Sequence, residues 1–408
     1  MSLYLRDFDI NYIYDLLKFT ELLAVTPPLN RKKQELTNYK YYHIIVILLI
    51  IIFAVYSSYG IIVYFIPKFN GTSTTLRLIC IIVITIMNVL SVLIAACNVD
   101  TWNMFLNVFK HLDQKLKYQS RSENNILKLE LSTFYLVLLS IFGYDAYVWY
   151  CNYHWDLFKF TLFKYVNFIH GNVMMLVILH FAAALSNRYK RINNLLIKSN
   201  DFYNIFNCLI VKGSEEKLNN LKSIKEVTDY YLLLSDLVEM FNKLFGWQIL
   251  IVTEYVLLFF LEFFNGLMLS LDPAQKSGVY HDLKTVISLV IFSFLAIGHQ
   301  AMIILFCENV NKESRNTLTI CYKLQETVDP MSEERKELTI LSDVVNFMKT
   351  KTNAAGFYNI DRSLLCRFFA YFFSYSIVLL QFNRQTTIRE TKVNNSISNV
   401  TEVLTTFN

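Results

Sequence analysis

The chain has 408 residues, of which 54% are hydrophobic and only 17% are charged, whereas an average soluble protein has about 45–50% and about 25%. The hydrophobic residues come in long uncharged blocks, which favours a chain embedded in lipid and excludes an ordinary cytosolic enzyme, a disulfide-stapled secreted domain and a disordered regulator. The net charge of +5 comes without a basic stripe of interleaved aromatic residues, so no nucleic-acid partner is expected.

The first 42 residues carry a short amphipathic pattern. Ile10, Ile13 and Leu17 recur at helical spacing, and Pro27 and Pro28 end the pattern. We expect residues 1–42 to form a cytoplasmic amphipathic segment whose helix lies on the helical bundle or on lipid headgroups, and packing on the bundle is favoured.

Seven apolar segments follow, and each is expected to cross the membrane as a helix. A helix needs about 20 residues to cross about 30 Å of hydrocarbon, and its backbone polar groups must be satisfied internally. All five prolines lie outside these segments, so unbroken helices are predicted. The last segment is the weakest, because only residues 368–382 are free of charge and that length is short for a crossing. The segments are 43–66, 76–97, 131–150, 164–186, 244–271, 283–307 and 364–382.

The distribution of Lys and Arg predicts the orientation of these spans. Of the 38 such residues, 28 fall in the N-terminal segment and in the loops on its side of the membrane, and nine fall on the opposite side. Positive charge accumulates in cytoplasmic loops, so we predict an all-α polytopic membrane protein with seven transmembrane helices, a cytoplasmic N-terminus and an extracellular C-terminus. Three glycosylation sequons lie on the predicted outer side, at Asn70, Asn394 and Asn399.

The inner loop after the sixth span predicts a helix with a narrow apolar seam. Leu338, Leu341, Val345 and Met348 follow one another at spacings of 3, 4 and 3, which is typical of helix-on-helix packing. The seam either packs within the chain as part of a helical hairpin or contacts other subunits, and the spacing favours neither.

Motifs of enzymes and of metal or cofactor sites are missing from the sequence. It has no nucleotide-binding glycine loop, no H-E-x-x-H and no Cys/His cluster with zinc spacing. We therefore predict that the chain is not an enzyme and holds no cofactor or metal. The tripeptide Asn187-Arg188-Tyr189 resembles the D-R-Y of rhodopsin-like receptors, but it follows the fourth span and is interpreted as a chance match in a basic loop.

The end of the last span carries a more specific signal. Residues 374–382 read S-Y-S-I-V-L-L-Q-F, which resembles the T-Y-h-h-h-h-h-Q-F signature of insect gustatory receptors, where h is hydrophobic. Ser374 replaces the Thr and keeps its hydroxyl, and Ser376 replaces one hydrophobic residue. Many sugar-sensing members carry a Glu directly after the Tyr. Here the residue after Tyr375 is Ser376, which favours the bitter-type group or an orphan member.

This resemblance implies a ligand-gated, non-selective cation channel in the plasma membrane. Members are homotetramers in the lipid bilayer, and a small tastant opens a pore for cations. It implies that helices one to six enclose an outward-facing ligand pocket and that four copies of the last helix line the pore. The implied regions are a cytoplasmic segment 1–42, a six-helix ligand-binding bundle 43–307, a cytoplasmic anchor for subunit contacts 308–363, a pore helix 364–383 and an extracellular tail 384–408.

The pore residues follow from one face of the last helix. Ser374, Ile377, Val378 and Gln381 share that face, and a polar Gln above aliphatic rings suits a constriction that gates by dewetting. Phe382 is expected to narrow the outer mouth. The alternative role for Gln381 is a hydrogen bond to a neighbouring helix.

Candidate ligand-binding residues are polar or aromatic groups in the outer halves of the spans. Asp145 and Glu262 are costly at membrane depth, so both are expected to face the interior and there either to pair or to take up a proton. Aromatic walls with a few polar groups are typical of small-molecule sites, although interface anchoring also explains each aromatic residue by itself. The full candidate set is Tyr144, Asp145, Tyr147, Trp149, Asn167, His170, Glu262 and Asn265.

Four other functions remain open at this point. A sugar-gated gustatory receptor and an odorant-receptor-like channel differ mainly in ligand. A G-protein-coupled receptor requires an extracellular N-terminus. A secondary transporter requires internal repeats, and none is evident in the sequence.

Overall fold

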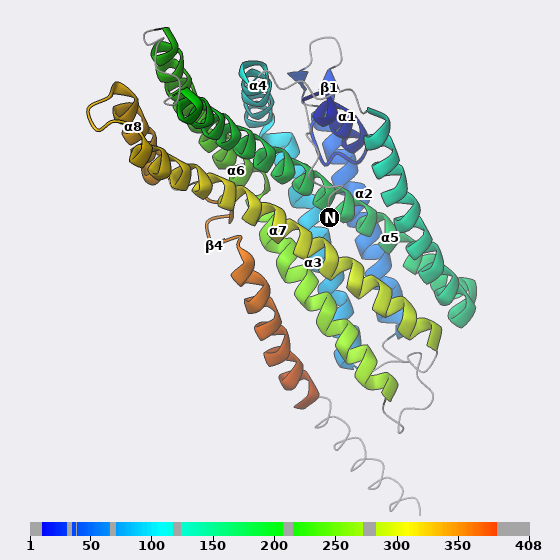
Figure 1. Cartoon of the computed structure of the whole chain (residues 1–408). Coiled ribbons are helices and arrows are strands. Elements are labelled where there is room, and N and C mark those ends of the chain that lie inside the picture. Colours follow the sequence, from blue (N-terminus) through cyan, green and yellow to red (C-terminus); the bar gives the residue numbers. More distant parts are fainter. Residues whose placement is uncertain are drawn as a thin grey trace, which may run out of the picture.

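The computed structural model describes residues 10–30, 35–37, 39–65, 71–116, 124–206, 215–271, 283–348 and 350–381. Helices dominate these ranges, and the long ones run side by side in an oblique bundle (Figure 1). The elements are α1 (Ile10–Thr20), η2 (Glu21–Leu23), β1 (Leu29–Asn30), β2 (Glu35–Leu36), α2 (Lys40–Gly60), η3 (Ile61–Phe65), α3 (Gly71–Cys97), α4 (Val99–Lys115), α5 (Asn124–Phe206), α6 (Glu215–Leu271), α7 (Leu283–Thr327), α8 (Glu333–Met348), β3 (Asn353–Ala354), β4 (Tyr358–Asn359) and a last helix, Arg362–Gln381.

Helix α5 folds back on itself. A straight helix would place residues 145 and 165 about 30 Å apart, yet the Tyr165 hydroxyl donates a hydrogen bond to the Asp145 carboxylate. The Phe142 ring lies 5.4 Å from the Tyr165 ring and 6.4 Å from the Phe168 ring. The chain therefore reverses between these positions, and α5 has a first arm that contains residue 145 and a second arm that contains residue 165.

Six helices among the described residues are long and apolar enough to cross a membrane. They are Lys40–Val63, Thr74–Cys97, Phe158–Ile197, Ile224–Met268, Leu283–Thr327 and Arg362–Gln381. They overlap six of the seven predicted spans, and the remaining one, 131–150, lies in the first arm of α5. The predicted sequons Asn70, Asn394 and Asn399 and the predicted pore residue Phe382 lie outside the described residues.

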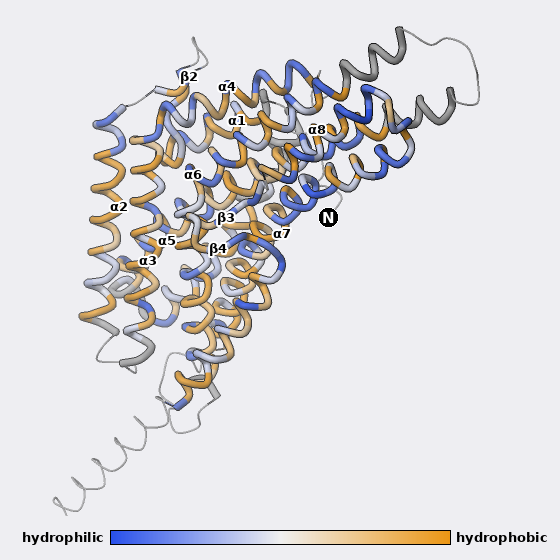
Figure 2. The backbone as a smooth tube through the Cα atoms, turned by 90° about the vertical axis from the view of Figure 1, so that its left-hand side faces the viewer, coloured by the Kyte–Doolittle hydropathy of each residue, from blue (hydrophilic) through white to orange (hydrophobic). Residues whose placement is uncertain are grey.

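The second arm of α5 forms the centre of the bundle. Every residue from 171 to 179 and from 181 to 189 is buried. Helix α5 as a whole contacts α7, α2, α6 and α3. By contrast, one side of α2 exposes large aliphatic residues such as Ile44, Leu48 and Ile52. Hydrophobic residues run along α2 and α3, while hydrophilic ones gather at the end that carries α4 and α8 (Figure 2). The exposed aliphatic surface is the one expected to face lipid.

Helices α6 and α7 are longer than a membrane is thick. Their 57 and 45 residues correspond to about 85 and 68 Å, against about 30 Å of hydrocarbon. Both extend toward the end of the bundle where α8 folds back on α7 (Figure 1). The predicted seam packs there within the chain, because Leu338, Leu341 and Val345 are buried where α8 meets α6 and α7. The hairpin alternative is therefore correct for this seam.

At the same end, the tripeptide Asn187-Arg188-Tyr189 lies inside α5, and its placement in a loop was wrong. The Arg188 side chain is fully buried and donates from Nε and Nη2 to the Asp113 carboxylate of α4, at 2.9 and 2.7 Å. Its Nη1 donates to the Ala184 carbonyl at 2.8 Å, and the Phe109 ring lies 4.6 Å from Cζ. This fork satisfies a charge that the core would otherwise exclude.

The N-terminal helix α1 packs on the bundle as its pattern predicts. Ile13, Leu16 and Leu17 are buried, and α1 contacts α5 and α4.

Two asparagines fix the short hairpin that precedes the last helix. Asn242 of α6 donates to the Lys351 carbonyl and accepts from the Asn353 amide. Asn311 of α7 accepts from the Thr352 amide and donates to the Ile360 carbonyl. The β3–β4 hairpin is thereby attached to both long helices, and it sets where the last helix begins.

The last helix contacts the bundle along one narrow face. Leu364, Phe368, Phe372 and Ser376, each four residues apart, are buried. The predicted pore residues Ser374, Ile377, Val378 and Gln381 are instead exposed on this single chain. Figure 1 shows this helix (orange) set apart from the main bundle.

Candidate functional site

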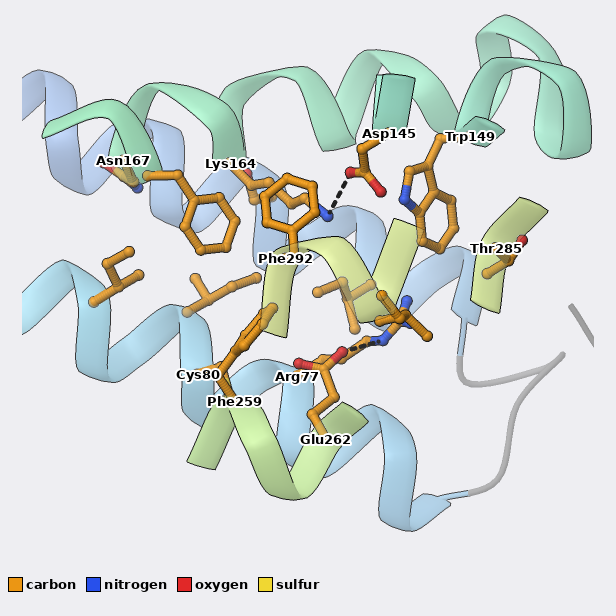
Figure 3. Close-up of a pocket in the computed structure, with 16 residues that line it drawn as sticks. Arg77, Cys80, Asp145, Trp149, Lys164, Asn167, Phe259, Glu262, Thr285 and Phe292 are labelled. Carbon is orange, nitrogen blue, oxygen red and sulfur yellow. Dashed lines mark ion pairs between the residues drawn. The ribbon is translucent and has the colours of Figure 1, made fainter. Parts of the chain in front are cut away.

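A cavity opens between α2, η3, α3, both arms of α5, α6 and α7. Water-sized molecules have about 80 Å³ of room inside it, which is enough for roughly five waters when one needs about 15 Å³ on this scale. Figure 3 shows its charged residues around a shared space, with aromatic rings among them. The lining residues are Ser57, Ile61, Arg77, Cys80, Ile81, Ile84, Asp145, Trp149, Lys164, Asn167, Phe168, Phe259, Glu262, Thr285, Leu289 and Phe292.

An ion pair between α3 and α6 forms one wall. The Arg77 Nε lies 2.8 Å from the Glu262 Oε1, and both side chains are about 10% exposed. Arg77, Cys80 and Ile84 lie at spacings of three and four, so one face of α3 presents all of them to the cavity. A guanidinium–carboxylate pair tolerates this depth because each charge compensates the other.

A second ion pair joins the two arms of α5. The Lys164 Nζ lies 3.5 Å from an Asp145 carboxylate oxygen. The same carboxylate accepts hydrogen bonds from the Tyr165 hydroxyl and from the Ser288 hydroxyl of α7, the latter at 2.5 Å. Two consecutive residues of the second arm of α5 and one residue of α7 therefore hold Asp145 in one position.

The indole of Trp149 lies between the two cations. Its ring is 5.2 Å from the Arg77 Cζ and 5.4 Å from the Lys164 Nζ, both within cation–π range. Asp145 and Trp149 are four residues apart on the same helical face, and both line the cavity.

Three phenylalanines lie where the cavity borders a second, smaller space. Phe168, Phe259 and Phe292 also line this smaller space of about 20 Å³ that contains Asn172 and His299. The Phe168 ring lies 6.1 Å from that of Phe292 and 6.4 Å from that of Phe259. Aromatic hydrocarbon thus lies beside the charged groups, and the Lys164 Nζ is 5.9 Å from the Phe168 ring.

Helix α6 connects this cavity to the last helix. Phe259 and Glu262 line the cavity, while Phe260 and Phe264 pack on Phe372 of the last helix, with ring distances of 4.2 and 5.7 Å. Because these residues occupy two turns of one helix, a displacement of α6 at the cavity also changes its contact with the last helix.

Half of the predicted ligand-binding residues line the cavity. Asp145, Trp149, Asn167 and Glu262 do so. Tyr144, Tyr147, His170 and Asn265 do not: Tyr147 is 54% exposed, Tyr144 is partly buried, and His170 and Asn265 are buried elsewhere in the bundle.

Two cations of the cavity were missed by sequence analysis. Arg77 and Lys164 lie close to span ends, so they were counted with the loop charges that set orientation. Asp145 and Glu262 held the signal that would have found them, because each buried carboxylate requires a positive partner at its own depth.

Among the described residues, no group of three or more His, Cys, Asp or Glu side chains is placed to hold a metal ion. The cavity itself brings two carboxylates together with two cations and several aromatic rings, and aromatic walls with a few polar groups are typical of small-molecule sites.

The sequence matches the family model for the 7tm chemosensory receptor over residues 15–386. The chain therefore belongs to this chemosensory receptor family, an all-α family of multi-pass membrane proteins rather than of enzymes. No curated protein matches the sequence.

Solved structures with a similar fold include the insect olfactory receptor OR5 from Machilis hrabei. It has a TM-score of 0.55 and 11% identity, and the match covers 92% of this chain and 100% of that one. The same receptor in complex with eugenol matches with the same values. At this identity the likeness concerns the fold.

Proposed function

We propose that this chain is a gustatory receptor that works as a ligand-gated, non-selective cation channel in the plasma membrane. A small plant-derived tastant of the bitter type binds in the cavity of Figure 3, which faces outward when the N-terminus is cytoplasmic. Four copies of the chain assemble so that their last helices line the pore. The similar receptor from Machilis hrabei, solved with eugenol, supports a small organic ligand.

The observation that carries this proposal is the position of α6. One face of the helix lines the cavity and another packs on Phe372 of the last helix. A ligand that binds the open arrangement better than the closed one moves the equilibrium by its difference in affinity. Helix α6 transmits that difference, since it contacts both sites.

The exposed faces of the last helix support its assignment to a pore. Ile377 and Val378 are 58% and 45% exposed on the single chain, while Ser376 faces the bundle. In a tetramer, aliphatic rings at these positions form a constriction that excludes water when narrow, and Gln381 supplies a polar ring beside it.

Patch-clamp recording of cells that express this chain alone tests the proposal. Trp149→Ala is expected to reduce the response to a plant-compound panel at least tenfold, because it removes an aromatic wall. The matched control is Tyr147→Ala, which alters an exposed ring outside the cavity lining. Responses without any conductance, or equal losses in both variants, would contradict the proposal.

A second variant tests the role of α6 in transmission. Phe372→Ala removes the ring that Phe260 and Phe264 contact. We expect ligand binding to persist while the maximal current falls, since coupling free energies of about 1–3 kcal/mol are typical. Phe294→Ala is the control, because Phe294 lies on α7, outside the last helix, and is 73% exposed. Unchanged maximal current in Phe372→Ala would show that another contact transmits the signal.

A further inference from the structure

The cavity lining has no net charge although it is rich in charges. Two cations, Arg77 and Lys164, face two carboxylates, Asp145 and Glu262. A ligand with a single charge would pair with one of these groups and leave its former partner uncompensated, which is costly in a buried site. A ligand with one charge of each sign replaces both partners of a pair and leaves none.

The two pairs differ in how firmly the protein holds them. Asp145 receives Lys164 and two hydroxyl donors from different elements, so displacing its partners breaks several bonds. The Arg77–Glu262 pair joins α3 to α6, the helix that also contacts the last helix. It is therefore the pair whose separation by a ligand would move α6.

The chemistry of this pair selects the charged groups of the ligand. A guanidinium offers a carboxylate two parallel hydrogen bonds, and Glu262 accepts from an ammonium. The Trp149 ring, 5.2 Å from the Arg77 Cζ, offers its face to a cation that takes a place near Glu262.

The apolar residues of the cavity lining select the uncharged part of the ligand. Ile84, Phe168, Phe259 and Phe292 are hydrocarbon, and burial of apolar surface against them favours a branched or aromatic side chain. The room of about 80 Å³ limits that side chain to a few carbon atoms.

We infer that the ligand is a small zwitterion with an apolar side chain, in its simplest form an apolar α-amino acid, whose carboxylate pairs with Arg77 and whose ammonium pairs with Glu262. This inference rests on the proposed function for its consequence, channel opening, but its binding step is separately measurable. Separation of the Arg77–Glu262 pair removes an ion pair from the contact between α3 and α6 and so weakens that contact.

Binding to the purified full-length protein tests the inference without requiring any current. The probes are L-leucine, its deaminated analogue 4-methylpentanoate, its decarboxylated analogue 3-methylbutylamine, the uncharged 4-methylpentan-1-ol and sucrose. We expect L-leucine to bind about 10- to 100-fold more tightly than each analogue, because a lost hydrogen bond to a charged group has that effect.

Two variants should change the order of the binding affinities of the probes in opposite directions. Arg77→Gln leaves Glu262 without its cation, so 3-methylbutylamine should bind more tightly than L-leucine. Glu262→Gln leaves Arg77 without its carboxylate, so 4-methylpentanoate should bind more tightly than L-leucine. The control is Lys284→Gln, a cation of α7 that lies 5.7 Å from the Tyr147 ring and outside the cavity lining, and it should preserve the original order.

The outcomes separate this inference from the proposed function. Three results would overturn the inference of a zwitterionic ligand. They are tightest binding of 4-methylpentan-1-ol or sucrose, an unchanged order of affinities in Arg77→Gln, and no binding of any probe. A response of the channel to an uncharged compound that Trp149→Ala abolishes would leave the proposed function intact. Binding of L-leucine without any current would contradict the proposed channel function but would agree with the inferred class of ligand.

Discussion

Two buried arginines of this protein face opposite situations. Arg188 is enclosed by protein, with a fork to Asp113, a bond to a carbonyl and the Phe109 ring against it. Arg77 also pairs with a carboxylate, but the pair borders a cavity that two other charged side chains, Asp145 and Lys164, also line. The first pair has nothing further to bind, whereas the second is placed to exchange partners. We therefore expect the buried charge to be structural in the first region and to take part in ligand recognition in the second.

The largest expected effect comes from breaking the enclosed pair. Arg188→Met should lower the free energy of unfolding by about 3–5 kcal/mol, because it leaves the Asp113 carboxylate uncompensated in the core. Thermal unfolding of the detergent-solubilised protein measures this loss. The double variant Arg188→Met/Asp113→Leu should recover most of it, and a double variant as unstable as the single one would contradict this explanation.

Breaking the pair at the cavity should cost less. Arg77→Gln is expected to lower the free energy of unfolding by about 1–2 kcal/mol, since water that enters the cavity can solvate Glu262. The same unfolding assay, run beside Arg188→Gln, gives the comparison directly. Equal losses for the two variants would remove the distinction between the two regions.

Substitutions of two glycines compare tight packing against the backbone with packing beside a cavity. A Cβ added at Gly246 would lie 2.6 Å from the Ala355 backbone nitrogen, so Gly246→Ala must displace the β3–β4 hairpin. We expect a loss of about 1–3 kcal/mol. At Gly171, beside the smaller cavity, the nearest atom is the terminal methyl of Met87 at 2.8 Å, which can move aside. Gly171→Ala should therefore cost clearly less, and the reverse order in thermal unfolding would contradict the described packing.

The smallest effect is expected at an exposed ion pair. Lys336 and Glu333 of α8 lie 2.8 Å apart with side chains 66% and 70% exposed. Lys336→Ala should change the free energy of unfolding by no more than about 0.5 kcal/mol, because water screens the pair. A loss comparable to that of Arg77→Gln would mean that proximity, rather than environment, sets the value of these pairs.

Much of the fold could be predicted from local pattern. Long uncharged blocks indicated spans, and the break in apolar character after residue 150 placed the chain reversal in α5 between two predicted spans. The spacing of Leu338, Leu341 and Val345 identified a packing face but not its partner, since a seam looks the same whichever helix covers it.

The candidate site could be predicted only in part. The cost of charge in lipid pointed to Asp145 and Glu262, and both line the cavity. Helical periodicity places Trp149 on the face of Asp145 and separates Tyr144 and Tyr147 from that face, so the spacing by itself distinguishes the lining residue from the other two. Which cation meets which carboxylate depends on how α3, α5 and α6 pack, and no local pattern contains that information.

The most direct test of the central claim, that the ligand acts in this cavity from outside, is agonist protection of an introduced thiol. Thr285 lines the cavity, and Thr285→Cys in a Cys80→Ser, Cys151→Ser background offers a single target there for a charged, membrane-impermeant thiol reagent. We predict that the reagent applied outside the cell modifies this cysteine and changes the current, and that an agonist slows the modification at least tenfold. Modification only from the cytoplasmic side, or at a rate that a saturating agonist leaves unchanged, would contradict the account.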